Sequence, residues 1–260
     1  MGLLTGKIAL ITGIGPGMGR DLALAFSREG AKLAITCRTR ERLESVAKEV
    51  RERGGVALTV EGGVGDEAGC KRFVEAAIRE YGRVDTLVNN AFVQPPFEQL
   101  DVQSVDVVIE SFQVNLFAAM RLAQLVVPGM RAQGGGTIVN INSSVMQKPL
   151  PTMGAYKMAK HALFALTQQL ACEFGPDAVR VNTVSPWYIQ GKSVEDYFEY
   201  LGAQAGTSGA AVKKTFTDQA ALRRLPGSDE ISNVAVFFAS ELSSAVTGQE
   251  IAVNCGAYYQ

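Results

Sequence analysis

Tyr156 and Lys160 are the two residues of this chain whose types and spacing most directly suggest chemistry. They lie four residues apart in a stretch expected to be helical, so a phenol and an ammonium project from one face. A phenol has an ordinary pKa of about 10, and a nearby cation lowers that pKa. The pair is therefore a candidate proton-transfer site. The alternative is that Tyr156 packs in the interior while Lys160 faces solvent.

A glycine-rich turn near the start of the chain is a candidate phosphate-binding site. It follows an apolar strand expected at residues 8–12 and precedes a helix that begins near Met18. Glycines let the backbone approach a pyrophosphate closely, and the free amides of a helix N-terminus favour an anion. A tight turn without a ligand is the alternative. The spacing is Gly-x-x-x-Gly-x-Gly, and the turn comprises Gly13, Gly15, Pro16, Gly17, Met18 and Gly19.

The elements that must position these groups alternate along the chain. Seven apolar, β-branched runs predict strands at residues 8–12, 32–37, 56–60, 84–89, 137–142, 179–185 and 250–254. Amphipathic stretches predict helices at 18–29, 40–53, 67–81, 105–131, 155–174 and 231–240. This alternation predicts one α/β domain over residues 1–260, a Rossmann-like doubly wound sheet of seven mainly parallel strands with helices on both faces.

One stretch, residues 187–224, interrupts this alternation. It carries aromatic and small residues where a tight connection between strand and helix would suffice. Because it follows the carboxyl end of a predicted strand, we expect a substrate lid. An oligomer contact or additional packing are the alternatives.

Composition excludes several classes of function. The chain has a formal net charge of −1 and 47% hydrophobic residues, so no broad basic surface favours a nucleic acid or an anionic membrane. Its four cysteines form no Cys-x-x-Cys pair, and its one histidine, His161, has no partners at metal-ligand spacing. No run of about 18 apolar residues occurs. We expect a soluble, cytoplasmic protein that binds a small molecule and no metal.

Several ordered motifs together resemble the short-chain dehydrogenase/reductase family over nearly the whole length. Residues 12–19 resemble its Thr-Gly-x-x-x-Gly-x-Gly cofactor loop, and residues 89–91 resemble its Asn-Asn-Ala-Gly strand end. Residues 137–145 are similar to its serine-bearing strand, and residues 156–160 to its Tyr-x-x-x-Lys motif. Later landmarks of the family match residues 180–186 and 247–249.

The resemblance implies an oxidoreductase that moves a hydride between a nicotinamide cofactor and a secondary alcohol or ketone. Its catalytic group would be Asn115, Ser144, Tyr156 and Lys160. Tyr156 would be the general acid/base, and Lys160 would lower its pKa and hold the nicotinamide ribose. A serine would orient the carbonyl, and Asn115 would help to anchor a water next to Lys160. Ser144 is favoured because a valine follows it, although Ser143 has the commoner spacing from Tyr156.

The resemblance also implies a set of cofactor-binding residues. NADP is predicted, with NAD possible, because Arg38 follows Cys37 where NAD-preferring relatives usually carry an acid. A guanidinium at that position can bind a 2′-phosphate. Pro16 removes one supporting signal, since many NADP enzymes have a basic residue there. The predicted residues are Gly13, Gly15, Pro16, Gly17, Met18, Gly19, Arg38, Val64, Asn89, Asn90, Ala91, Tyr156, Lys160, Pro186 and Ile189.

Departures from the family pattern keep two alternatives open. Phe92 and Trp187 replace glycines, and Gly191 stands where a threonine often contacts the nicotinamide. A dinucleotide-binding protein without turnover is therefore one alternative. A halohydrin dehalogenase-like enzyme is the other, although Lys160 and the intact glycines argue against it. The aromatic residues between 188 and 200 favour an apolar substrate, and the resemblance implies a homotetramer or homodimer formed through helices 105–131 and 155–174.

Overall fold

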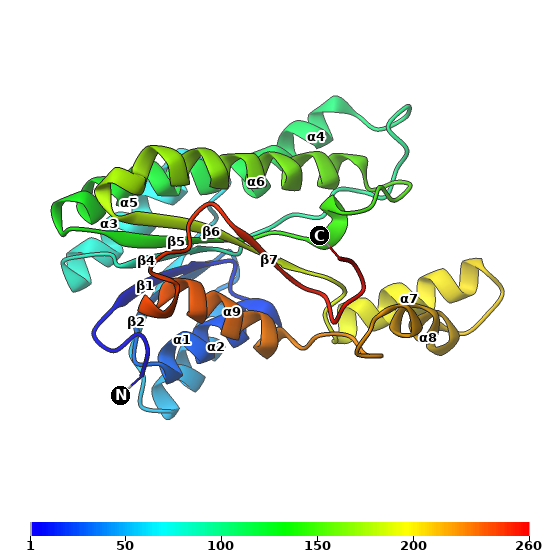
Figure 1. The fold of residues 1–260 in the computed structure, drawn as a ribbon, viewed down its shortest axis with the longest axis horizontal. Coiled ribbons are helices and arrows are strands. Elements are labelled where there is room, and N and C mark those ends of the chain that lie inside the picture. Colours follow the sequence, from blue (N-terminus) through cyan, green and yellow to red (C-terminus); the bar gives the residue numbers. More distant parts are fainter. Residues whose placement is uncertain (1, 260) are drawn as a thin grey trace.

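The computed structural model describes residues 2–259, in which strands and helices alternate (Figure 1). The strands are β1 (Ile8–Thr12), β2 (Lys32–Cys37), β3 (Ala57–Glu61), β4 (Thr86–Asn89), β5 (Gly136–Ile141), β6 (Val179–Pro186) and β7 (Glu250–Val253). The α-helices are α1 (Met18–Arg28), α2 (Arg40–Glu52), α3 (Glu67–Tyr81), α4 (Val105–Phe112), α5 (Ala118–Ala132), α6 (Gly154–Phe174), α7 (Lys192–Gln204), α8 (Gly209–Gln219) and α9 (Ser228–Ala239).

The seven strands form one sheet in the order β3-β2-β1-β4-β5-β6-β7, and every neighbouring pair is parallel. The register places Leu10 of β1 between Ala34 of β2 and Leu87 of β4, and all three are fully buried. Residues buried on both faces of a sheet produce continuous apolar runs instead of alternation. The predicted doubly wound fold is confirmed.

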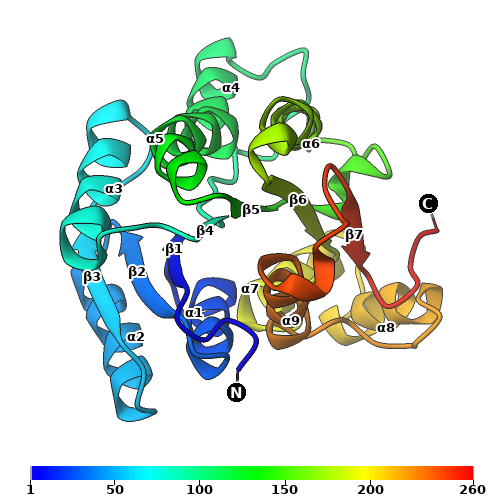
Figure 2. The same cartoon turned by 60° about the vertical axis from the view of Figure 1, so that its left-hand side comes forward.

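Helices cover both faces of the sheet. Helices α1, α2 and α9 lie on one face, and α3, α5 and α6 lie on the other (Figures 1 and 2). Phe26 of α1 belongs to the first apolar layer, and Phe73 of α3 and Leu122 of α5 belong to the second. Each such fully buried side chain stabilises the fold by about 1.5–3 kcal/mol relative to exposure. The two layers hold the strands rigidly behind the site.

The helix predicted for residues 105–131 is interrupted. Helix α4 begins after Ser104, whose side chain accepts a hydrogen bond from the Asp106 amide, and it gives way to a π-helical turn at Gln113–Phe117. Helix α5 continues from Ala118. The prediction of one continuous helix was therefore wrong, because the π-helical turn divides it into α4 and α5. Apolar periodicity does not show a single π turn, and such turns are frequent at functional sites.

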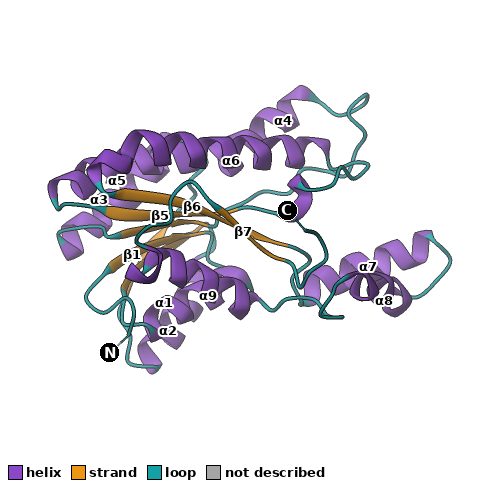
Figure 3. Cartoon of the chain, in the orientation of Figure 1, coloured by secondary structure: helices purple, strands orange, loops and turns teal. Residues whose placement is uncertain are grey.

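Residues 187–224 form a helical hairpin, α7 and α8, which extends beyond the sheet (Figures 1 and 3). Its own small apolar core is centred on Trp187, Phe198, Ala220 and Leu225. The hairpin follows the carboxyl end of β6. No helix within residues 2–259 combines the length and apolar character needed to cross a membrane.

Candidate active site

The candidate site lies where the carboxyl ends of the central strands meet. Because the strands are parallel, Thr12 of β1, Asn89 of β4, Ile141 of β5 and Pro186 of β6 end at one edge of the sheet. The chain runs outward from β1 to β3 and then returns to the other side of β1 with β4. Ligands of open α/β sheets bind at such a reversal of strand order.

The glycine-rich turn connects β1 to α1 at this reversal. Gly13 has a φ of +74°, and a Cβ atom there would lie 2.5 Å from the Cα of Ala91. A Cβ at Gly19 would lie 2.4 Å from the Gly13 carbonyl oxygen. At Gly15 and Gly17 a Cβ would meet no protein atom within 4 Å. Two glycines thus permit close backbone packing, while the other two leave the outer side of the turn clear.

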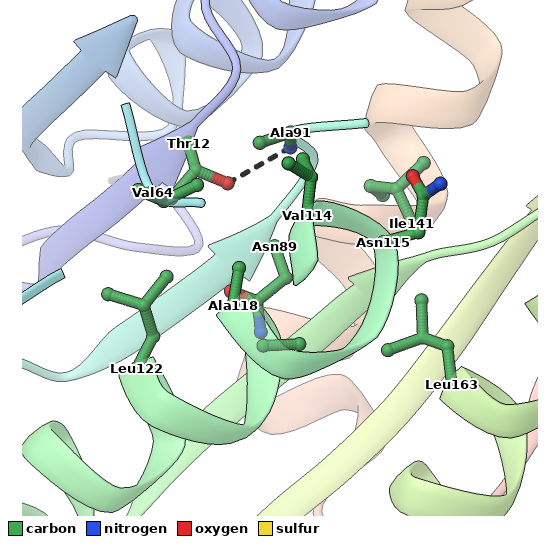
Figure 4. A pocket seen from close by; sticks show the side chains of 11 residues that line it. Thr12, Val64, Asn89, Ala91, Val114, Asn115, Ala118, Leu122, Ile141 and Leu163 are labelled. Carbon is green, nitrogen blue, oxygen red and sulfur yellow. Dashed lines mark hydrogen bonds between the residues drawn. The ribbon is translucent and has the colours of Figure 1, made fainter. Parts of the chain in front are cut away.

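Polar side chains from β1 and β4 hold this turn in shape. The Asn90 side chain donates hydrogen bonds to the carbonyls of Thr12 and Gly13, at 3.0 and 2.9 Å. The Thr12 hydroxyl accepts from the amides of Asn90 and Ala91, both at 3.0 Å, and Figure 4 shows the bond from Ala91. The Asn89 side chain donates instead to Asn140 of β5, at 2.8 Å. Both predicted asparagines therefore act on the turn and the sheet through hydrogen bonds within the protein.

The turn fits the pyrophosphate of a dinucleotide. Helix α1 begins after Gly17, and no side chain among residues 2–259 caps its first amides. These amides and the positive end of the helix favour an anion. The Val64 side chain is buried beside this edge. Pro186 is buried at the end of β6, and Ile189 packs against the apolar layer of α1 and α9.

Arg38 lies just beyond the carboxyl end of β2. It is exposed, and within residues 2–259 its guanidinium has no hydrogen-bond or ion-pair partner that meets the usual distance limits. A Cβ at Gly63 would lie 3.5 Å from the Cγ of Arg38, so the aliphatic part of Arg38 passes over Gly63. The neighbouring Arg40 lies 3.9 Å from the Glu61 carboxylate. The position after Cys37, where an acid would repel a 2′-phosphate, carries Arg38 instead.

The first turns of α6 bring Tyr156 and Lys160 to the end of β5. The Lys160 ammonium lies 5.6 Å from the centre of the Tyr156 ring and donates to the Ile141 carbonyl at 3.0 Å. Lys160 is only 2% exposed, and burial lowers its pKa to about 7. Burial raises the pKa of Tyr156 to about 12, and the Ser143 hydroxyl, placed to hydrogen-bond the phenol, lowers it in part. Desolvation is the largest effect on the pKa of both groups, and the lowering of the phenol pKa by Lys160 stays a prediction.

The two serines have different surroundings. The Ser143 hydroxyl is next to the Tyr156 phenol and accepts a hydrogen bond from the Val145 amide at 3.2 Å. The Ser144 hydroxyl is buried, and no partner for it occurs in the part of the chain that the structure describes. Geometry thus favours Ser143 as the partner of Tyr156. Ser144, predicted because a valine follows it, stays a prediction.

Asn115 lies in the π-helical turn between α4 and α5 and is 2% exposed. Its amide nitrogen donates to the Val93 carbonyl and the Ser111 hydroxyl, both at 2.9 Å. Its amide oxygen accepts from the Val93 amide at 3.1 Å. Asn115 lines the same small pocket as Ile141 (Figure 4). Its side chain therefore fixes the loop that follows β4, and its predicted link to Lys160 through a water stays a prediction.

Sequence reasoning missed two contributors to this site. Thr12 entered it only as part of the glycine motif, although it accepts the two bonds that join the turn to β4. Lys157 was not considered, yet its ammonium donates to the carbonyls of Val145 and Met146. The available signal was a second lysine within the Tyr-x-x-x-Lys motif itself.

Fold and site together define the class of protein: a dinucleotide-binding α/β enzyme with a Tyr-x-x-x-Lys centre at the carboxyl edge of its sheet. A family model described as enoyl-(acyl carrier protein) reductase matches residues 13–258. The chain belongs to the short-chain dehydrogenase/reductase family. It is an NAD(P)-dependent oxidoreductase of the kind that acts on alcohol and ketone groups.

Named relatives and solved structures support this assignment along nearly the whole chain. A 3-oxoacyl-(acyl-carrier-protein) reductase of Thermotoga maritima is 32% identical over 97% of this chain and 98% of its own. L-sorbose reductase of Gluconobacter frateurii, solved with NADPH and L-sorbose, is 30% identical, with a TM-score of 0.93 and all of both chains covered. A xylitol dehydrogenase solved with NAD+ is also 30% identical, with a TM-score of 0.91 over 97% of this chain and 99% of its own.

Proposed function

We propose that the chain is an NADP(H)-dependent oxidoreductase that interconverts a secondary alcohol and a ketone, with Tyr156 as the general acid/base. The observation that carries the proposal is the convergence of Tyr156, Ser143 and Lys160 at the carboxyl edge of the sheet where the glycine-rich turn also lies. When bound, the nicotinamide supplies or accepts the hydride. Tyr156 donates its proton to the carbonyl oxygen in reduction and accepts the alcohol proton in oxidation. Ser143 holds that oxygen in line, a role that we assign to it in place of Ser144.

Arg38 supports NADP(H) as the preferred cofactor. Its guanidinium is exposed at the end of β2 and has no acidic partner within residues 2–259. A guanidinium binds phosphate oxygens through charge-assisted, often bidentate hydrogen bonds. Gly63 leaves room for the aliphatic part of Arg38, which keeps the guanidinium at the rim of the adenosine site. L-sorbose reductase, a structural neighbour, was solved with NADPH.

The α7–α8 hairpin supports a substrate with an apolar body. Tyr188 and Tyr197 stack with ring centres 6.0 Å apart, and Phe97, from the loop after β4, stacks on Tyr197 at 5.8 Å. This ladder of three rings joins the hairpin to the opposite side of the site. Aromatic walls favour apolar ligands, and a few polar groups set their orientation. We assign residues 187–224 the role of a lid over the substrate.

Assembly into a homodimer or homotetramer is part of the proposal. Three apolar side chains of α4 and α5 are well exposed, namely Val105 at 70%, Ile109 at 50% and Met120 at 41%. Exposed apolar surface of this kind is typical of protein–protein contacts. Sedimentation equilibrium that shows only monomer would contradict this part.

The deciding experiment is a turnover screen of secondary alcohols and ketones, followed at 340 nm with NADPH and with NADH. We expect turnover by the wild-type protein and a loss of about 10²–10⁴-fold in Tyr156→Phe, which is the usual contribution of general acid–base catalysis. Cofactor binding, measured by fluorescence quenching, should change less than about twofold in the same variant, since the ring is kept. Tight cofactor binding with no turnover would favour a binding protein without catalysis. In that case Phe92, which replaces a glycine of the family pattern and is 60% exposed beside this edge, would be the first residue to examine.

A further inference from the structure

Helix α6 holds the serine-bearing turn with two lysines. The turn Ser144–Met146 is a short 3-10 helix that directly follows β5 and Ser143. The Lys157 ammonium donates to the carbonyls of Val145 and Met146, at 3.0 and 2.5 Å. Lys160, three residues later and thus on the same face of α6, donates to Ile141 before the serines. The serine pair is therefore bracketed by one lysine on each side.

The carbonyls that Lys157 binds need a partner. The last carbonyls of a helix receive no hydrogen bond from an amide of that helix. When they are buried, another donor must satisfy them. Met146 is 6% exposed and Val145 is 6% exposed. Lys157 supplies an ammonium with three donors, the strongest class of partner available to a carbonyl.

The location of Lys157 in α6 indicates that its hydrogen bonds to the turn 144–146 are a specific feature of the fold. Lys157 lies in the first turns of the helix, near the positive end of its dipole, where a cation is disfavoured. Desolvation also lowers the pKa of Lys157. Two unfavourable effects act on this ammonium, and its bonds to the turn are the compensating contacts. The Asn142 side chain adds a third tie, because it donates to the Lys160 carbonyl at 3.1 Å.

We propose that Lys157 is a positioning residue, which holds the turn 144–146 against α6 so that the Ser143 hydroxyl stays beside the Tyr156 phenol. This inference rests on the proposed function for its catalytic consequence. The mechanical part is independent of it, because the Ser143 hydroxyl binds the Val145 amide, and Lys157 binds the carbonyl of that same residue. A shift of the turn therefore moves the serine. A displacement of about 1 Å in a positioned group costs on the order of a hundredfold in rate.

The test compares Lys157→Met with Lys157→Arg and with the control Lys148→Met. Lys148 carries the same charge on the same loop but is exposed. Hydrogen exchange of peptides that cover residues 141–150 reports on the turn without any substrate. We expect exchange at least about tenfold faster in Lys157→Met, near wild type in Lys148→Met, and largely restored in Lys157→Arg, whose guanidinium can also bind two carbonyls.

Kinetics in the assay of the proposed function give the second readout. We expect kcat to fall about ten- to a hundredfold in Lys157→Met, with recovery in Lys157→Arg and with NADPH affinity within about twofold of wild type. Unchanged exchange, or faster exchange with an unchanged kcat, would overturn the positioning role. A lowered melting temperature with lost NADPH affinity would also overturn it, because that result indicates general damage. If the wild-type protein itself showed no turnover, the proposed function would fail, and the exchange comparison would still decide whether Lys157 holds the turn.

Discussion

The buried ammonium of Lys160 should make the free energy of unfolding of the cofactor-free protein depend on pH. The substitution Lys160→Met should remove this dependence. Lys160 is 2% exposed, and its ammonium makes one hydrogen bond within the described residues, to the Ile141 carbonyl. Burial lowers its pKa from 10.5 to about 7. Between these two values the unfolded chain binds a proton that the folded protein does not. The free energy of unfolding must therefore rise with pH in this range.

The size of the effect follows from the two pKa values of Lys160. Below about pH 7 both states carry the proton and the cost of burying the charge is complete, whereas above about pH 10.5 neither state carries it. Between about pH 7 and pH 9 the folded protein should gain about 2 kcal/mol relative to Lys160→Met, which has no charge to bury. Tyr156, whose pKa burial raises to about 12, titrates above this window and does not interfere.

The assay is urea unfolding followed by circular dichroism at several pH values, for wild type, Lys160→Met and the exposed control Lys148→Met. Other groups titrate in all three proteins, so the difference between curves isolates the lysine. Wild type and Lys148→Met should rise together with pH, while Lys160→Met stays flatter. Parallel curves for wild type and Lys160→Met would refute the reasoning, since Lys160 would then keep an ordinary pKa in the folded protein.

Three further predictions concern the serines, the cofactor and the hairpin. Ser143→Ala should lower kcat about a hundredfold and Ser144→Ala less than about threefold in the ketone assay, and the reverse order would restore Ser144 as the catalytic serine. Arg38→Ala should raise the KM for NADPH by about ten- to a hundredfold, because one charged hydrogen bond is lost. The KM for NADH should stay within about twofold of wild type, and equal effects on the two cofactors would contradict a phosphate contact. Phe198→Ala should lower the free energy of unfolding by about 3 kcal/mol in urea, against less than about 1 for the 56% exposed Tyr200→Ala, and equal losses would contradict a packed hairpin core.

The fold was predictable because its determinants are local and repeated. The run at residues 32–37 and the helix at 67–81 were predicted with the bounds that the structure has, since apolar strand runs and amphipathic helices are signals within single segments. Asp66 accepts a hydrogen bond from the Gly69 amide, which starts the helix where an N-cap residue predicts it. The π turn at residues 113–117 was not predictable, because one inserted residue shifts the phase of a helix without a change in composition.

The site was predictable in its parts and not in its contacts. Tyr156 and Lys160 were found because four residues make about one helical turn. The choice between Ser143 and Ser144 cannot be made from strand periodicity, because β5 ends before them and the backbone turns there. The alternation of side chains along a strand no longer decides orientation in such a turn. The role of Lys157 depends on two backbone carbonyls that lie 11 and 12 residues away in the sequence. Because every residue has a backbone carbonyl, the sequence does not indicate which ones a lysine binds.

The distribution of hydrogen bonds separates the residues that build the site from those that remain free to act on ligands. Asn90, Asn115 and Lys157 use their donors on backbone carbonyls of loops that meet at the edge of the sheet. Buried polar groups satisfied in this way rigidify a site, because each loop loses alternative positions. Within residues 2–259, Ser143 is the one hydrogen-bonding neighbour of the Tyr156 phenol and Arg38 is exposed, so both keep capacity for further bonds. This division agrees with the proposed function, in which Tyr156 exchanges a proton and Arg38 binds the charged cofactor. Substitutions of the loop-fixing residues should therefore alter rates without a change in the chemistry.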